Sequence, residues 1–217
     1  MNFINGVVHF ATSGGLWMVP IFIAAAVGFA IGLERFIKLS KVERANRRMW
    51  EQLQPALIQN DFNKARALTA NDTSIVSQLL QTGLELQGSV RDREEIEVVM
   101  EEEMMAIVPQ LEKRTAYIAL YANLATLLGL LGTVMGLISA FDAVANASPA
   151  EKSNLLSASI AEAMNCTSFG LMVAIPLLIV NLFLTTKASR IIDSLEIVSL
   201  KTLNAIFKNA QRENKAG

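Results

Sequence analysis

The stretch that decides the fold is GLLGTVMGLISAFD, from Gly129 to Asp142. It lies in an uncharged run that begins after Arg114 and ends at Asp142. A helix that rises ~1.5 Å per residue crosses the ~30 Å hydrocarbon core of a bilayer in about 20 residues. The run lacks the strict apolar–polar alternation of a strand, so it predicts a membrane-spanning helix.

Two further stretches have the same character, one from about Gly14 to Leu33 and one between Glu162 and Lys187. Apolar residues make up 52% of the 217 residues, more than an ordinary soluble domain of this size contains. We therefore predict an all-α integral membrane protein, with three transmembrane helices and long cytoplasmic helical extensions.

Basic residues set the expected orientation. They follow the first span, precede the second and follow the third, whereas the connection between spans two and three carries only Lys152. By the positive-inside rule the amino terminus lies outside and the carboxyl terminus inside. The expected segments are an outer segment 1–15, a transmembrane helix 16–36, a cytoplasmic helical domain 37–114, a transmembrane helix 115–141, an outer loop 142–162, a transmembrane helix 163–186 and a cytoplasmic tail 187–217.

Several classes of function lack the residues they require. One cysteine, Cys166, and one histidine, His9, make neither an intrachain disulfide nor a metal cluster. The glycines of GLLGTVMG follow no strand and precede no lysine, so they do not form a phosphate-binding loop. The net charge of −1 gives no electrostatic footprint for nucleic acid. We expect no enzyme activity, no cofactor and no nucleic-acid partner.

The segments outside the predicted spans show helical spacing of apolar residues. Residues 34–114 predict helices that begin after an N-cap at Asn60 or Asp61 and that lead toward the second span, with a kink at Pro109. The tail keeps an apolar stripe at Ile191, Ile192, Leu195, Val198 and Leu203. These stripes predict a helical bundle outside the membrane, within one subunit or between subunits.

Small residues recur on one face of the second span. Their spacing of three or four residues predicts a helix-packing seam, because small side chains let helix backbones approach closely in lipid. The seam residues of the second span are Gly129, Gly132 and Gly136, and on the third span we add Gly170 and Pro176.

Thr133 stands beside this seam and has two interpretations. Its hydroxyl group can bind the carbonyl of Gly129, one turn back. Alternatively it lines a pore, because Thr167 lies at a similar depth on the antiparallel third span and begins a small or polar face that ends at Asn181. The second interpretation explains both threonines, and we favour it.

Glu162 opens the third span, either as an interfacial carboxylate or as a group that attracts cations. No Asp, Glu, Lys, Arg or His lies deep in any span. A proton path needs a group that can hold a proton. If this protein conducts protons, that group belongs to another chain. Cys166 and Met164 are interpreted as packing residues.

The sequences LATLLGLLGTVMGLISAF at 124–141 and SIAEAMNCTSFGLMVAIP at 159–176 closely resemble the TolQ/ExbB/MotA family of cation-channel motor subunits. Three spans and this length fit the TolQ/ExbB branch and make the chain ExbB-like. In the family's pattern, Thr133 and Thr167 match the pore threonines and Glu162 matches the third-helix glutamate. Because the partner of this family brings a membrane aspartate, the missing internal carboxylate is expected.

The resemblance also implies an assembly and a location. It implies a homopentamer in the bacterial inner membrane, around two copies of a single-span ExbD/TolR-like partner. Flow of protons would drive work in the periplasm or at the outer membrane, in some systems through a TonB/TolA-like protein.

One residue departs from the family's pattern. Ser168 follows the third-span threonine, where TolQ/ExbB proteins commonly have alanine. An extra oxygen near Thr133 and Thr167 keeps Na⁺ open as the conducted ion. The rival function is a membrane scaffold that binds partners through the glycine seam and does not conduct.

Overall fold

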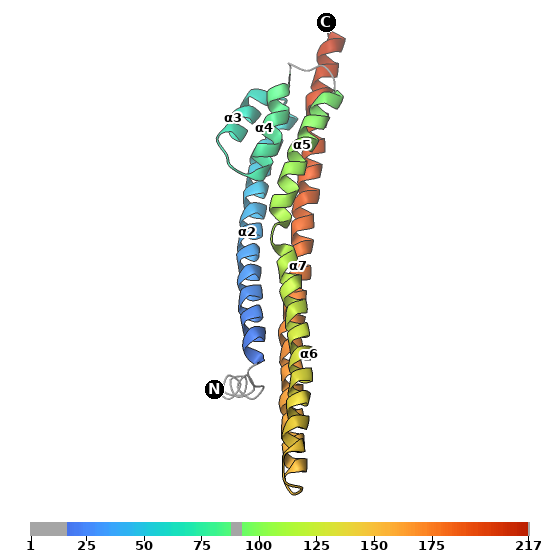
Figure 1. The fold of residues 1–217 in the computed structure, drawn as a ribbon. Coiled ribbons are helices and arrows are strands. Elements are labelled where there is room, and N and C mark those ends of the chain that lie inside the picture. The colour runs from blue at the N-terminus through green and yellow to red at the C-terminus, as the bar shows by residue number, and fades with distance from the viewer. Residues whose placement is uncertain (1–16, 88–92, 217) are drawn as a thin grey trace, which may run out of the picture. The chain divides into compact units, whose positions relative to one another are not determined.

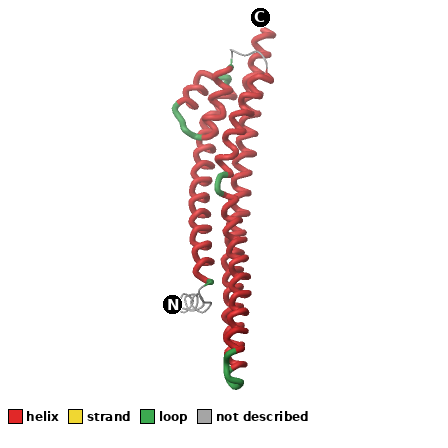
Figure 2. Tube along the Cα trace, in the orientation of Figure 1, coloured by secondary structure: helices red, strands yellow, loops and turns green. Residues whose placement is uncertain are grey.

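The computed structural model describes residues 17–87 and 93–216, with side chains up to residue 208. Its regular elements in this part of the chain are helices (Figures 1 and 2). They are α2 (Met18–Ile58), α3 (Phe62–Ala70), α4 (Ile75–Leu86), α5 (Arg93–Glu112), α6 (Thr115–Ala145) and α7 (Lys152–Ala216). The predicted all-α class is confirmed.

The chain divides into two compact units. One combines the residues up to Arg35 with residues 114–183, and we call it the membrane unit. The other combines residues 36–113 with residues 184–217, and we call it the soluble unit. Helices α2 and α7 each begin in the membrane unit and continue into the soluble unit without interruption.

Three helices are long and apolar enough to cross a membrane, as the sequence predicted. In the membrane unit they expose large apolar side chains, including Phe22, Leu127 and Leu182, each more than 60% accessible within this chain. A soluble monomer rarely exposes so much apolar surface. These side chains suit contact with lipid or with other membrane helices.

The connection between α6 and α7 is shorter than the predicted outer loop 142–162. Helix α6 extends to Ala145 and α7 begins at Lys152, so only 146–151 is non-helical. Most of the segment predicted as loop is therefore helix. A loss of apolar residues marks where a chain leaves the hydrocarbon, but the helix continues as long as its backbone hydrogen bonds do.

The interruption before the second span lies at Lys113 and Arg114. Helix α5 continues through Pro109, the predicted kink, to Glu112. Arg114 has φ 65°, a left-handed conformation in which a helix ends, and α6 begins at Thr115.

In the soluble unit, α3 and α4 form a capped helix pair. Asp61 is the N-cap of α3 and accepts a hydrogen bond from the backbone N–H of Lys64 at 3.0 Å. Ser74 caps α4, while Ser74 N–H and the Ser77 hydroxyl donate to the Asp72 carboxylate at 3.1 and 2.7 Å. Partial burial would raise the pKa of Asp72, but these hydrogen bonds outweigh it and hold the pKa below its ordinary value.

The apolar stripes meet within the soluble unit of this chain. Ile96, Met100 and Ile107 of α5 are buried, and a side chain at Gly83 of α4 would meet Met100. In the tail Ile191, Leu195, Val198 and Leu203 are buried, while Ile192 is half-buried. The predicted helical bundle outside the spans is therefore found inside one subunit.

Candidate ion-path site

The glycine seam packs α6 directly on α7 of the same chain. A Cβ atom on Gly170 would lie 2.6 Å from the carbonyl oxygen of Ala125 and 3.2 Å from the Cα of Gly129. A Cβ on Gly136 would lie 2.8 Å from the Cβ of Ala163. Real side chains do not approach so closely, so these positions need glycine for this packing. Figure 1 shows α6 and α7 side by side along this contact.

This close approach brings Thr133 and Thr167 together. The hydroxyl of Thr133 donates to the carbonyl oxygen of Gly129 at 3.0 Å, and the hydroxyl of Thr167 donates to the same oxygen at 3.0 Å. The two hydroxyls also contact each other. We call Thr133, Thr167 and the Gly129 carbonyl the threonine cluster.

The cluster has more oxygen contacts than protons. Three oxygen atoms touch one another, but each hydroxyl carries a single proton, so two protons serve three contacts. At any moment one contact lacks a donor.

The first interpretation of Thr133 is confirmed, and the pore lining of the second stays a prediction. Its hydroxyl binds the carbonyl of its own helix, as the first interpretation predicted, and it meets Thr167 at the same depth, as the second required. The hydrogen bond within the helix positions the Thr133 hydroxyl toward α7.

The other candidate residues lie apart from this cluster. Ser168 is exposed and donates to the carbonyl of Met164 on its own helix at 2.9 Å, and Glu162 is also exposed. Asn181 is half-buried, and its Oδ1 atom is buried without a hydrogen-bond partner among the described residues. Within the described chain no hydrogen bond or ion pair connects these three side chains to the threonines.

Two predicted packing residues are exposed within this chain. Pro176 is exposed, so it does not belong to the glycine seam within this chain, although α7 continues through it. Met164 is 61% exposed and has no packing role inside the subunit, whereas Cys166 is 1% exposed and faces Gly132 as a packing residue should. A position in an apolar run does not reveal which side of the helix faces protein.

Thr115 is not among the residues predicted for the site, and its hydroxyl is buried and has no hydrogen-bond partner in the described chain. A signal was present, because Thr115 precedes Gly129 by the same 14 residues by which Asn181 follows Thr167.

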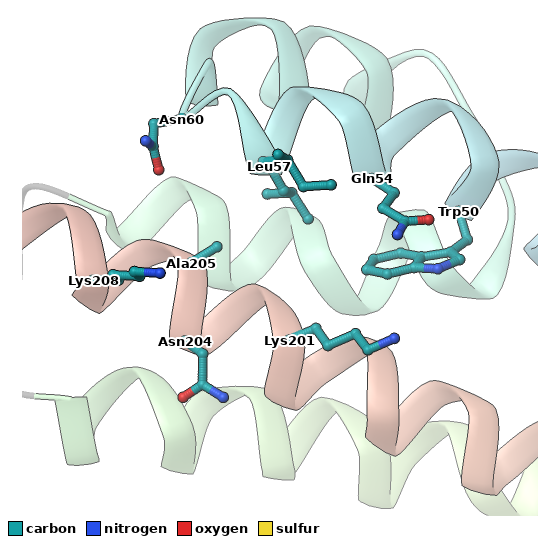
Figure 3. A pocket seen from close by; sticks show the side chains of 9 residues that line it. Trp50, Gln54, Leu57, Asn60, Lys201, Asn204, Ala205 and Lys208 are labelled. Carbon is teal, nitrogen blue, oxygen red and sulfur yellow. The ribbon is translucent and has the colours of Figure 1, made fainter.

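The soluble unit contains a separate hollow of about 350 Å³ (Figure 3). Trp50, Gln54 and Leu57 of α2 line one side, and Lys201, Asn204 and Lys208 of α7 line the other. The Lys201 ammonium lies 5.8 Å from the centre of the Trp50 ring, a cation–π contact. The described chain contains no cluster of three His, Cys, Asp or Glu side chains that would hold a metal here or elsewhere.

Comparison with known proteins decides the family. The family model described as the MotA/TolQ/ExbB proton channel family matches residues 71–197, more than half of the chain and including the threonine cluster. The chain belongs to the MotA/TolQ/ExbB family. This is a family of channel and transport proteins, and membership agrees with three helices able to span a membrane.

Two curated relatives of this family are similar over most of the chain. One, from Methanothermobacter thermautotrophicus, is named a putative biopolymer transport protein ExbB homolog. It is 28% identical over 93% of this chain and 71% of its own length. The other, from Synechocystis sp., is named putative biopolymer transport protein ExbB-like 3 and is 25% identical over 79% of this chain and 81% of its own length. The similarity is therefore to the ExbB-like part of the family.

Proposed function

We propose that this chain is the channel and stator subunit of an ion-driven membrane motor, with the ion passing the threonine cluster. The observation that carries the proposal is the convergence of the Thr133 and Thr167 hydroxyls on the Gly129 carbonyl. An incompletely donated oxygen cluster at membrane depth suits the transient binding of a cation or hydronium. A purely structural seam would need only the glycines.

The proton-holding group comes from a partner. No Asp, Glu, Lys, Arg or His side chain lies in α6 between Thr115 and Phe141, and α7 has none between Ala163 and Thr186. Threonine does not titrate in a useful range, so a carboxylate from an ExbD/TolR-like single-span subunit completes the path. Two copies of that subunit within a pentamer of this chain, in the bacterial inner membrane, are the proposed assembly. A TonB/TolA-like protein would carry the work outward.

We propose the proton as the conducted ion. A sodium path would draw on the extra oxygen of Ser168, but that hydroxyl is exposed and donates to Met164 on its own helix. Sodium prefers several oxygen ligands at once, and Ser168 does not add one to the threonine cluster in this chain.

The scaffold alternative requires a seam that is free to bind a partner. Gly129, Gly132 and Gly170 are buried, and their close contacts are with the other helices of the same chain. The seam is therefore occupied within the subunit, which favours the channel over the scaffold.

The test removes each hydroxyl in turn. Thr133→Ala and Thr167→Ala are expected to lower proton flux by about tenfold or more, because a hydrogen bond of ~1.4 kcal/mol corresponds to tenfold in rate. Flux is measured in vesicles that contain the chain with its single-span partner, and assembly is checked by size-exclusion chromatography.

Thr126→Ala is the matched control for this test. Thr126 also lies in α6 and its hydroxyl donates to the carbonyl of Ala122 at 3.2 Å, but it belongs to no cluster with α7. Thr126→Ala should conduct protons at the same rate as the parent chain. Normal flux in both Thr133→Ala and Thr167→Ala would remove the proposed path.

A further inference from the structure

Two buried side-chain oxygen atoms at one end of the membrane unit have no hydrogen-bond partner among the described residues. One is the Thr115 hydroxyl oxygen, in a residue that is 6% exposed, and the other is the Asn181 Oδ1 atom. Leaving a buried donor or acceptor unsatisfied lowers the stability of a fold, because the group has lost its hydrogen bonds to water. Two such groups in one small unit call for a common explanation.

The register of α6 against α7 places these two residues at the same level. The helices are antiparallel, and Gly129 contacts Thr167 at their seam. Thr115 precedes Gly129 by 14 residues, and Asn181 follows Thr167 by 14 residues. Fourteen residues are nearly four helical turns, so each side chain returns to the facing side after the same rise of ~21 Å.

The charged side chains at this level, two arginines and one glutamate, carry a net positive charge. Arg114, directly before Thr115, pairs with Glu34 at 3.2 Å, and Arg35 is 4% exposed. Helix α6 begins here without a side-chain cap, so its amino end adds a partial positive charge, and its first backbone N–H groups have no capping side chain. A resident metal cation is unfavourable in this setting, whereas a neutral molecule that both donates and accepts hydrogen bonds is not.

We propose that Thr115 and Asn181 share an ordered water molecule, and that this water is a second station on the ion path, resting on the function proposed above. The water donates to Asn181 Oδ1 and accepts from the Thr115 hydroxyl, and first-turn N–H groups of α6 supply a further donor. Buried waters typically have about three such partners in proteins. The station lies ~21 Å along the seam from the threonine cluster.

A shared water makes a distinctive prediction for stability. Thr115→Val or Asn181→Leu alone leaves the other polar group and its water without a partner, so each lowers the melting temperature of the full chain in detergent. The double variant replaces both groups by apolar ones of similar shape and recovers most of the loss. Melting-temperature changes that simply add would overturn the shared water.

The flux measurement separates a path role from a structural one. The double variant, once its melting temperature has recovered, still conducts protons about tenfold less well in vesicles with the partner subunit, since one hydrogen-bonded step is gone. Thr115→Ser, which keeps the hydroxyl, conducts like the parent chain, and Thr126→Val is the control for an α6 hydroxyl outside the path. Full flux in the double variant, or lost flux in Thr115→Ser, overturns the station.

These outcomes also separate the two proposals. If Thr133→Ala and Thr167→Ala block flux while the double variant conducts, only the second station fails. If the threonine-cluster variants conduct normally, the function proposed above fails first.

Discussion

Gly129 contributes both to the packing of α6 on α7 and to the hydrogen bonds of the threonine cluster. Its missing side chain lets Thr167 and Gly170 of α7 come close, and its carbonyl then accepts the hydroxyls of both threonines. The same absence of a side chain that lets the two helices pack in lipid therefore creates the oxygen cluster. A substitution that separates α6 from α7 should weaken both the packing of the two helices and the oxygen cluster.

Gly170→Ala tests this link. The new Cβ would lie 2.6 Å from the carbonyl oxygen of Ala125, a backbone atom that cannot turn aside. We expect a loss of about 1–3 kcal/mol in the free energy of unfolding, as for other overpacked sites, and lower proton flux. Thermal unfolding of the purified protein in detergent measures the first effect.

Gly32→Ala is the control for Gly170→Ala. Its Cβ would meet only a methyl group of Val180, at 3.1 Å, which a small side-chain movement relieves. Gly32→Ala should lower the free energy of unfolding clearly less than Gly170→Ala does. Equal stability of Gly170→Ala and the parent chain would mean that α6 and α7 do not pack as closely as described.

At the scale of the elements, hydrogen bonds from one side chain hold the short helix α3 to α4. Helix α3 has only nine residues, too few to be stable alone. Arg66 of α3 donates to the carbonyl oxygens of Leu84 and Gln87, both at 2.8 Å, where α4 ends. The last carbonyls of a helix have no partner inside it, so Arg66 caps α4 and holds α3 to it.

Arg66→Gln should therefore loosen the α3–α4 pair. We expect a local loss of about 1–2 kcal/mol, because hydrogen bonds from charged donors are worth ~1.5–3 kcal/mol and this side chain is partly exposed to solvent. Hydrogen exchange of residues 62–86 should speed up by about tenfold. Lys64→Gln, which changes an exposed side chain of the same helix, should leave exchange unchanged. Unchanged exchange in Arg66→Gln would contradict the capping role.

At the scale of the whole molecule, the two units differ in the surface they show. The membrane unit exposes apolar side chains, while charged groups such as Arg47 and Glu51 are paired and exposed in the soluble unit. The basic residues that follow the first span predict that the soluble unit lies in the cytoplasm. The orientation remains a prediction.

Two fusions test the orientation. A reporter fused after Ala216, at the end of α7, should report the cytoplasm, and one inserted after Pro149, between α6 and α7, should report the outer side. Each fusion is the control for the other. An outer signal after Ala216 would reverse the topology.

The sequence by itself determined the three spans, the family pattern around Thr133 and Thr167, and the residues that share each helical face. These properties follow from composition and from a period of 3.6 residues, which are local. The tail stripe from Ile191 to Leu203 and the N-cap at Asp61 were predictable for the same reason.

Only the tertiary structure decided which partner each face meets. Lipid tails and helices are equally apolar, so the sequence does not say whether Met164 or Pro176 faces protein, or whether the glycine seam binds its own chain or a neighbour. Contact between α6 and α7 fixed the register, and the register brought both threonines to one carbonyl and Thr115 to the level of Asn181. Which groups a hydroxyl meets on the neighbouring helix depends on that register. The sequence of either helix alone does not determine the register.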